Sequence, residues 1–230
     1  MKYLSRILEE QFSVLTFRSV KPDLDNNFSS YLLYVLFVTW IVGVGRYWDH
    51  PAAHIWQYFG LGSIAYIFTL TTFLYLVVLP INPPRWSWKM VFVFVGFTSL
   101  PALLYAVPVE RFTPLGTAQA INVGFLGIVA LWRVALYVSF LRNGAGIGKF
   151  GTFIATLLPL SAIVVSLTFL NLEHAMFEVM AGIRDEERTA NDTAYGVVLA
   201  LGVLAYVMFP ITLVCYVIEI YRQRGPNSEP

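Results

Sequence analysis

Six long apolar stretches constrain this 230-residue chain more than any other feature. They run over Tyr31–Tyr47, Ile55–Ile81, Trp88–Val109, Thr117–Leu141, Thr152–Leu172 and Ala194–Tyr221. A helix needs about 20 mostly apolar residues to cross the hydrocarbon core of a bilayer. Because 57% of the residues are hydrophobic and only 13% are charged, a soluble domain could not cover itself with polar surface. The sequence therefore predicts an all-α, polytopic membrane protein with about six transmembrane helices in a lipid bilayer.

The basic residues are unevenly divided between the two sides of these stretches. With the N-terminus inside, ten of the fifteen lysines and arginines fall in inside segments, four fall in outside segments, and Arg133 remains within a span. Cytoplasmic loops of membrane proteins carry such an excess of basic residues. The predicted topology has both termini in the cytoplasm. Short loops and short tails favour a multi-pass protein of a bacterial inner membrane.

Three segments follow from this topology: a cytoplasmic N-terminal segment (1–30), a six-helix transmembrane domain (31–222) and a cytoplasmic tail (223–230). In the first segment, residues 3–16 place Leu4, Ile7, Leu8 and Leu15 on one helical face, which Gln11 interrupts. This pattern fits an amphipathic helix in the membrane interface or a soluble helix packed on a cytoplasmic loop. Residues 172–186 predict another amphipathic helix, on the outer side.

Arg133 is the most informative single residue, because a charged side chain within a membrane span needs a partner. Glu219, near the inner end of the sixth span, is the only carboxylate within a predicted span. An intramembrane ion pair between Arg133 and Glu219 is therefore expected. Two alternatives remain open. The Arg133 side chain could snorkel toward the interface, and Glu219 could pair with Arg222 one turn further on.

Prolines lie inside three predicted spans, at Pro101, Pro159 and Pro210. Each removes a backbone donor and is expected to kink its helix. Kinked helices near the midplane of a membrane can form the substrate site of a transporter. They are also common in spanning helices that transport nothing, where neighbouring groups bind the freed carbonyls.

The histidines form a loosely spaced pattern that predicts a metal site on the outer side. His50 and His54 are spaced to share one helical face, and so are His174 and Glu178. These four residue types could together ligate a zinc ion. Their spacing matches no established metal motif, so no cofactor is the main expectation and zinc the alternative.

The third to fifth spans resemble bacterial members of the Yip domain family. The resemblance rests on FTSLPALLYAVPVE over 97–110 with Pro101 and Pro108, on Leu131-Trp132-Arg133, and on the Asn143-Gly144 loop before a span containing Pro159. It implies a helical membrane fold and a cytoplasmic N-terminus. It implies no defined reaction, and it carries over no catalytic residue.

These patterns favour a non-enzymatic role in organising the membrane or in binding a membrane or cytoplasmic protein. The chain contains no catalytic motif, and a net charge of +1 gives no case for binding nucleic acid. Two alternatives remain: a small transporter that uses the kinked helices, and a metal-dependent enzyme on the outer face.

Overall fold

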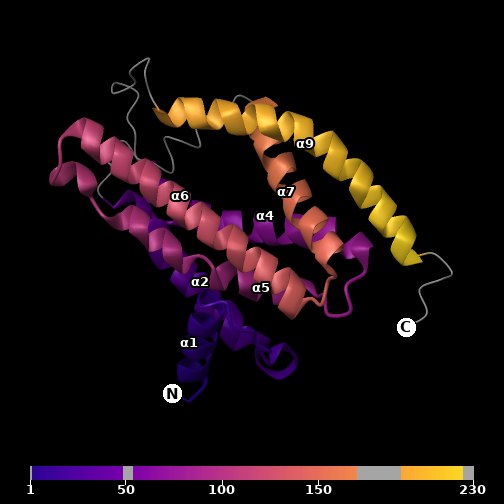
Figure 1. The fold of residues 1–230 in the computed structure, drawn as a ribbon. Helices are drawn as coiled ribbons and strands as arrows, with labels where there is room; N and C mark the ends of the chain where they lie inside the picture. Colours follow the sequence, from indigo (N-terminus) through magenta and orange to yellow (C-terminus); the bar gives the residue numbers. More distant parts are fainter. Residues whose placement is uncertain (1, 49–53, 170–192, 225–230) are drawn as a thin grey trace.

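The computed structural model describes residues 2–48, 54–169 and 193–224, and the regular structure within these ranges is helical (Figure 1). The α-helices are α1 (Lys2–Leu15), α2 (Leu24–Tyr47), α3 (Ile55–Tyr58), α4 (Leu61–Val78), α5 (Trp88–Phe97), α6 (Leu115–Ser139), α7 (Lys149–Phe169) and α9 (Thr193–Arg224). Three 3₁₀ segments, η1 (Leu79–Ile81), η2 (Leu100–Ala106) and η3 (Val109–Arg111), follow α4 and α5, and a π-turn, η4 (Phe140–Gly144), ends α6.

Six of these helical stretches are long and apolar enough to cross a membrane, which confirms the predicted fold class. They cover Leu24–Tyr47, Leu61–Ile81, Trp88–Arg111, Gly116–Gly144, Lys149–Phe169 and Ala200–Arg224. The helix predicted over residues 172–186 lies outside the described residues.

The first two stretches differ from the prediction at their starting points. The first helix begins at Leu24 rather than Tyr31, because the Asp23 carboxylate accepts a hydrogen bond from the Asn26 amide and caps it. The stretch predicted as one helix over Ile55–Ile81 is broken at Gly60, where φ is +67°. This left-handed conformation suits glycine, and a Cβ on Gly43 would lie 2.9 Å from the Gly60 backbone. Helices α2 and α4 thus meet at two glycines.

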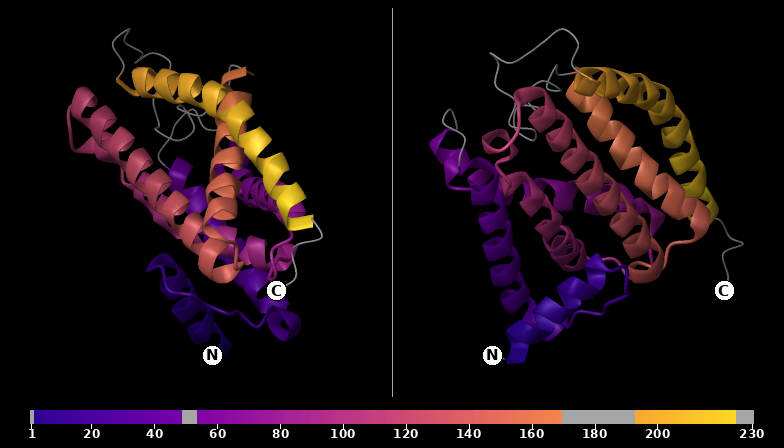
Figure 2. Two further views of the ribbon diagram at one scale, coloured as in Figure 1. Left: turned by 45° about the vertical axis from the view of Figure 1, so that its right-hand side comes forward. Right: turned by 60° about the vertical axis from the view of Figure 1, so that its left-hand side comes forward.

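The main core is formed where α2, α4 and α5 pack together, and α7 and α9 lie side by side along one edge of the molecule (Figure 2). Every residue of α5 from Val91 to Phe97 is buried. A Cβ on Gly96 would lie 2.1 Å from a methyl group of Val35, so α2 and α5 approach closely at this point. Small residues allow such close helix contacts in membranes, where packing rather than water drives association.

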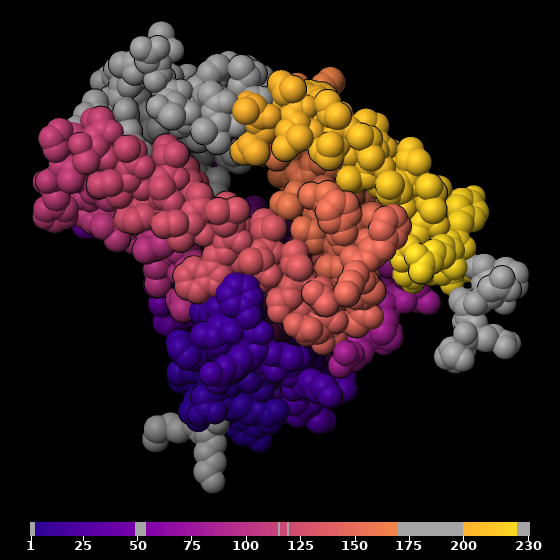
Figure 3. Space-filling view, in the orientation of Figure 1, coloured from indigo at the N-terminus to yellow at the C-terminus, as the bar shows by residue number. Residues whose placement is uncertain are grey.

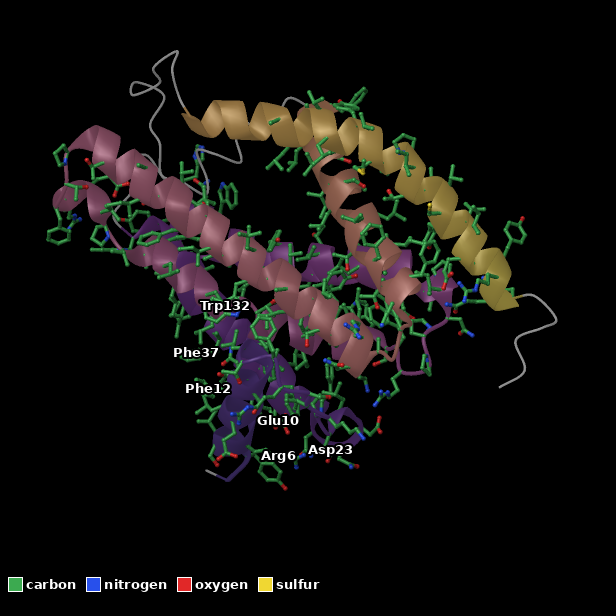
Figure 4. The ribbon with its side chains drawn as sticks, viewed as in Figure 1. Arg6, Glu10, Phe12, Asp23, Phe37 and Trp132 are labelled. Carbon is green, nitrogen blue, oxygen red and sulfur yellow. The ribbon has the colours of Figure 1, made fainter. Side chains whose placement is uncertain are left out.

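Helix α1 closes one end of the bundle, far from α9 in the space-filling view (Figure 3). Residues 2–15 form the helix that the pattern predicted. Its buried face carries Ile7, Gln11 and Leu15, so the glutamine lies within this face. Leu8 and Phe12, by contrast, are half or more exposed. In Figure 4 the labelled side chains of Phe12 on α1, Phe37 on α2 and Trp132 on α6 lie in a row that leads from α1 to α6.

The break after α5 explains the position of Gln11. Pro101 has no amide hydrogen, so the carbonyl of Phe97, four residues earlier, has no intrahelical donor from that position. The Gln11 side chain fills this role: its Nε2 donates to the Phe97 oxygen at 3.1 Å. The Tyr34 hydroxyl in turn donates to Gln11 Oε1. The glutamine that interrupts the apolar face of α1 therefore joins α1 to α2 and α5.

Pro159 likewise removes a backbone amide donor from α7, and a side chain from another helix replaces it. It leaves the carbonyl of Ala155 without its donor, and the Tyr137 hydroxyl of α6 donates to that oxygen at 3.3 Å. Both α7 and α9 continue as helices through Pro159 and Pro210. The kinks expected at these prolines stay predictions, whereas at Pro101 the α-helix gives way to 3₁₀ geometry.

Tyr137→Phe is expected to lower the free energy of unfolding by about 1 kcal/mol, since it leaves the Ala155 carbonyl without a donor in an apolar interior. Pro159→Ala supplies an amide donor for the same carbonyl, so the cost of Tyr137→Phe should shrink in that background. The measurement is denaturant unfolding in detergent micelles, with Tyr206→Phe on α9 as the matched control. Equal costs of Tyr137→Phe in the two backgrounds would contradict this assignment.

Candidate functional site

Arg133 lies in α6 with an aromatic partner. Its guanidinium carbon is 5.7 Å from the centre of the Tyr66 ring on α4. A cation over an aromatic face gains about 0.5–2 kcal/mol, depending on how much water is excluded. Placing an arginine near the centre of a membrane helix costs about 2.5–3.5 kcal/mol on insertion scales. The tyrosine therefore offsets only part of the cost of this charge.

Arg46, near the end of α2, makes the same kind of contact. Its guanidinium carbon lies 5.2 Å from the centre of the Tyr105 ring in η2. Its Nε is buried and forms no hydrogen bond with the residues that the structure describes. A buried N–H of a cation without an acceptor is costly. Arg46 Nε thus lacks a hydrogen-bond acceptor among the described residues.

The two contacts are brought together by η2, which carries Tyr105 and packs against both α2, which carries Arg46, and α6, which carries Arg133. We call Arg46, Tyr66, Tyr105 and Arg133 the arginine–tyrosine cluster. Four elements contribute to it: α2, α4, η2 and α6. The cluster adjoins a small apolar core formed by Val42, Ala102 and Val129, with Tyr105 packed against it. The helices that carry the two charges are therefore fixed relative to one another.

Aromatic contacts also order the end of the bundle next to the cluster. The guanidinium carbon of Arg111 lies 4.9 Å from the centre of a Trp48 ring, and the Trp48 Nε1 donates to the Ala106 carbonyl at 3.0 Å. The Tyr58 hydroxyl donates to the Trp48 carbonyl at 2.8 Å. Trp48 thus joins the end of α2 to η2 and α3. Arg46, Arg111 and Arg133 thus each lie over an aromatic ring.

The expected ion pair between Arg133 and Glu219 is not among the contacts that the described residues make. The Glu219 side chain is nearly buried, and its oxygens face Gln223 at 2.9 Å and Arg222 at 3.8 Å. The alternative partner Arg222 is thus the one that the structure places beside it. Glu219 Oε1 also packs against α7, where a Cβ on Gly151 would lie 3.2 Å away. Arg133 and Glu219 therefore belong to separate polar groups.

The structure describes only one of the four proposed metal ligands. His54 is exposed and lies just before α3, with its backbone amide donating to the Gln57 side chain at 2.8 Å. His50, His174 and Glu178 lie outside the described residues. Among the described residues, no three histidine, cysteine, aspartate or glutamate side chains form a group able to hold a metal ion. The zinc site stays an untested prediction.

Arg46 is one of the four basic residues that the predicted topology assigns to outside segments, and no sequence pattern singles out Tyr66 or Tyr105. Tyrosines are common throughout this chain, which has 13 of them, so composition does not distinguish these two. A usable signal is the position of Arg46 within an apolar stretch that ends at Tyr47. Its partner could not be found from the sequence, because α2 and η2 are brought together only by the fold.

Comparison with known proteins gave no match: no family model fits the chain, and no curated protein or solved structure is significantly similar to it. The site is therefore interpreted from its own residues.

The separation of Arg133 from Glu219 predicts that Arg133→Leu and Glu219→Leu change the free energy of unfolding additively, to within about 0.5 kcal/mol. Arg133→Leu and Tyr66→Leu, in contrast, should show a coupling energy of about 0.5–2 kcal/mol, because each removes the same cation–π contact. Two double-mutant cycles measured by unfolding in the same detergent distinguish the cases. Strong coupling between Arg133 and Glu219, with none to Tyr66, would contradict the described arrangement.

Proposed function

We propose that this protein is a non-enzymatic, multi-pass membrane protein that organises the surrounding membrane by holding an anionic group in the arginine–tyrosine cluster. The observation that supports this role most directly is that Arg46 and Arg133 lie over aromatic rings, with an unmet acceptor requirement at Arg46 Nε. The planar guanidinium group binds phosphate through paired hydrogen bonds, and a tyrosine hydroxyl can donate another. The proposed ligand has the chemistry of a phosphate, borne by a phospholipid headgroup or free in solution.

The buried hydroxyl side chains support binding over transport. Those of Thr98, Ser99 and Thr156 donate to backbone carbonyls of their own helices, at 2.7–2.9 Å. Ser161 and Thr212 do the same on α7 and α9. Hydroxyls bound in this way satisfy helix carbonyls and are not presented to a passing solute. Among the buried hydroxyls of the described residues, that of Thr71 is the one without a hydrogen-bond partner.

The proposed setting is a bacterial inner membrane with both termini in the cytoplasm. It is supported by the excess of basic residues on the side of the N-terminus and by the resemblance to the Yip domain family. In a Cys215→Ser background, Thr113→Cys should react with an impermeant thiol reagent in intact cells. Lys2→Cys should react only after permeabilisation. The opposite pattern of labelling would reverse the proposed orientation.

The ligand proposal is tested with purified protein in nanodiscs that contain phosphatidylglycerol, with retained phospholipid counted by native mass spectrometry. Arg46→Gln and Arg133→Gln should each weaken retention about tenfold, since hydrogen bonds to charged groups are worth roughly 1.5–3 kcal/mol. Arg224→Gln, which changes an exposed arginine at the end of α9, is the matched control and should change little.

A second arm distinguishes the two sources of phosphate. Thermal stabilisation of delipidated protein by inorganic phosphate, abolished in Arg46→Gln, would identify a free anion. Stabilisation by phosphatidylglycerol alone would identify the lipid. If neither effect depends on Arg46 or Arg133, the proposed site is wrong.

A small transporter is the alternative function, favoured by the break in the third span between Phe97 and Leu100. Interrupted spans commonly surround the substrate sites of transporters. The same preparation decides between the two roles when it is reconstituted in liposomes loaded with radiolabelled phosphate. Release that requires Arg46 and Arg133 would show transport, whereas binding without release supports the proposed organising role.

A further inference from the structure

A small cavity lies at the end of the bundle that holds α1, and its lining residue Leu136 is one turn beyond Arg133 on α6. It measures about 50 Å³ and is enclosed by the end of α1, the following linker, α5 and the end of α6. Its apolar wall is formed by Val14, Val93, Phe94, Phe97, Leu136 and Phe140. The polar residues Arg18, Ser19 and Asn143 also line it, and all three are exposed. The cavity is therefore apolar within and polar at its opening.

The π-turn η4 shapes one side of this cavity. Phe140, Asn143 and Gly144 all come from this turn and line the cavity. A Cβ on Gly144 would lie 2.9 Å from the Phe140 ring and 3.2 Å from the Met90 methyl group, and Met90 lines the cavity as well. The absence of a side chain at Gly144 thus leaves room between these two residues. Single π-turns occur frequently at functional sites.

The other side depends on an unusual turn after α1. Phe17 adopts a left-handed conformation with φ +63°, which is uncommon for a bulky residue. The Arg18 amide donates back to the Ser13 carbonyl at 2.8 Å, which closes the helix end. This turn directs Arg18, Ser19 and Val20 over the cavity that Val14 lines. Strained backbone of this kind persists where the surrounding structure holds it, often at binding sites.

Basic residues surround the same end of the bundle. Arg18, Lys21, Arg85 and Lys89 are all exposed there, and Arg85 donates to the Asn143 carbonyl at 3.4 Å. The nearby Asp23 carboxylate already accepts hydrogen bonds from Asn26 and Asn27. A ligand that enters the cavity from the membrane therefore meets a cationic opening. Charge complementarity selects an anionic headgroup over a zwitterionic one.

We propose that this cavity binds the first methylene groups of one acyl chain of an anionic phospholipid from the adjoining leaflet, with the phosphate against Arg18, since about 50 Å³ has room for a few methylene groups. The chain would lie between Phe94, Phe97 and Leu136, and Ser19 and Asn143 would add hydrogen bonds to the headgroup. The site lies at the opposite end of the bundle from Arg46 and uses none of the residues of the arginine–tyrosine cluster. It therefore stands or falls independently of the proposed function.

The test counts phospholipid bound to the full-length protein by native mass spectrometry, in nanodiscs of phosphatidylcholine with increasing phosphatidylglycerol. Gly144→Ala and Val14→Phe narrow the cavity and should each weaken phosphatidylglycerol binding about tenfold. Arg18→Gln should reduce the preference for phosphatidylglycerol over phosphatidylcholine about fivefold, because its charge is exposed. Gly124→Ala, where a Cβ meets nothing within 4 Å, and Arg224→Gln are matched controls.

Each outcome decides the proposal. Loss of binding in Gly144→Ala and Val14→Phe, with thermal midpoints close to that of the unmodified protein, supports the cavity as the acyl-chain site. Val14→Phe changes a partly exposed position, so it remains informative if Gly144→Ala disturbs the π-turn. Unchanged binding in a folded Val14→Phe variant would overturn the proposal. So would an unchanged lipid preference in Arg18→Gln, or a loss that occurs only in Arg46→Gln.

Discussion

A membrane interior offers no water to a backbone carbonyl, and this constraint determines how the helices of this protein are joined. Proline and left-handed residues interrupt the helical hydrogen-bond ladder at several points, and each interruption frees carbonyl oxygens. Side-chain donors from elsewhere in the chain bind them: Gln11 to Phe97, Tyr137 to Ala155, Trp40 to Phe59, Trp132 to Leu15 and Tyr216 to Val77. The irregular points of the spans are therefore also the points where distant segments are attached.

Charged side chains within the bundle, like the freed carbonyls, are stabilised by neighbouring side chains. Arg46 and Arg133 lie over tyrosine rings, while Glu219 is retained near the end of α9 beside an arginine that reaches the surface. Aromatic faces stabilise a cation without adding a buried carboxylate, whose own desolvation would be costly. This arrangement leaves the cations available to an external anion. An ion pair with an internal carboxylate would have occupied the guanidinium groups and left them unable to bind an external anion.

The sequence was sufficient for the elements that depend on composition alone. Six spans follow from hydropathy, and the α1 helix follows from its apolar period. The helix bounds in the structure differ from the predicted ones where a single residue controls the local backbone geometry, as at Gly60, or where a capping side chain extends a helix, as at Asp23. The arginine–tyrosine cluster could be predicted only in part. Arg133 stands out in an apolar stretch, but its neighbour depends on how α4 crosses α6, and no local pattern encodes that crossing.

The packing of α9 bears on how the chain is made. Among the described helices, α9 contacts chiefly α7, with a smaller contact to η1. Its Tyr216 also packs against the main core, and the Tyr216 hydroxyl donates to the Val77 carbonyl of α4 at 2.6 Å. During synthesis, the contacts among α2, α4 and α5 can form before the last span leaves the ribosome. The position of the last span in the bundle therefore depends mainly on its contact with α7.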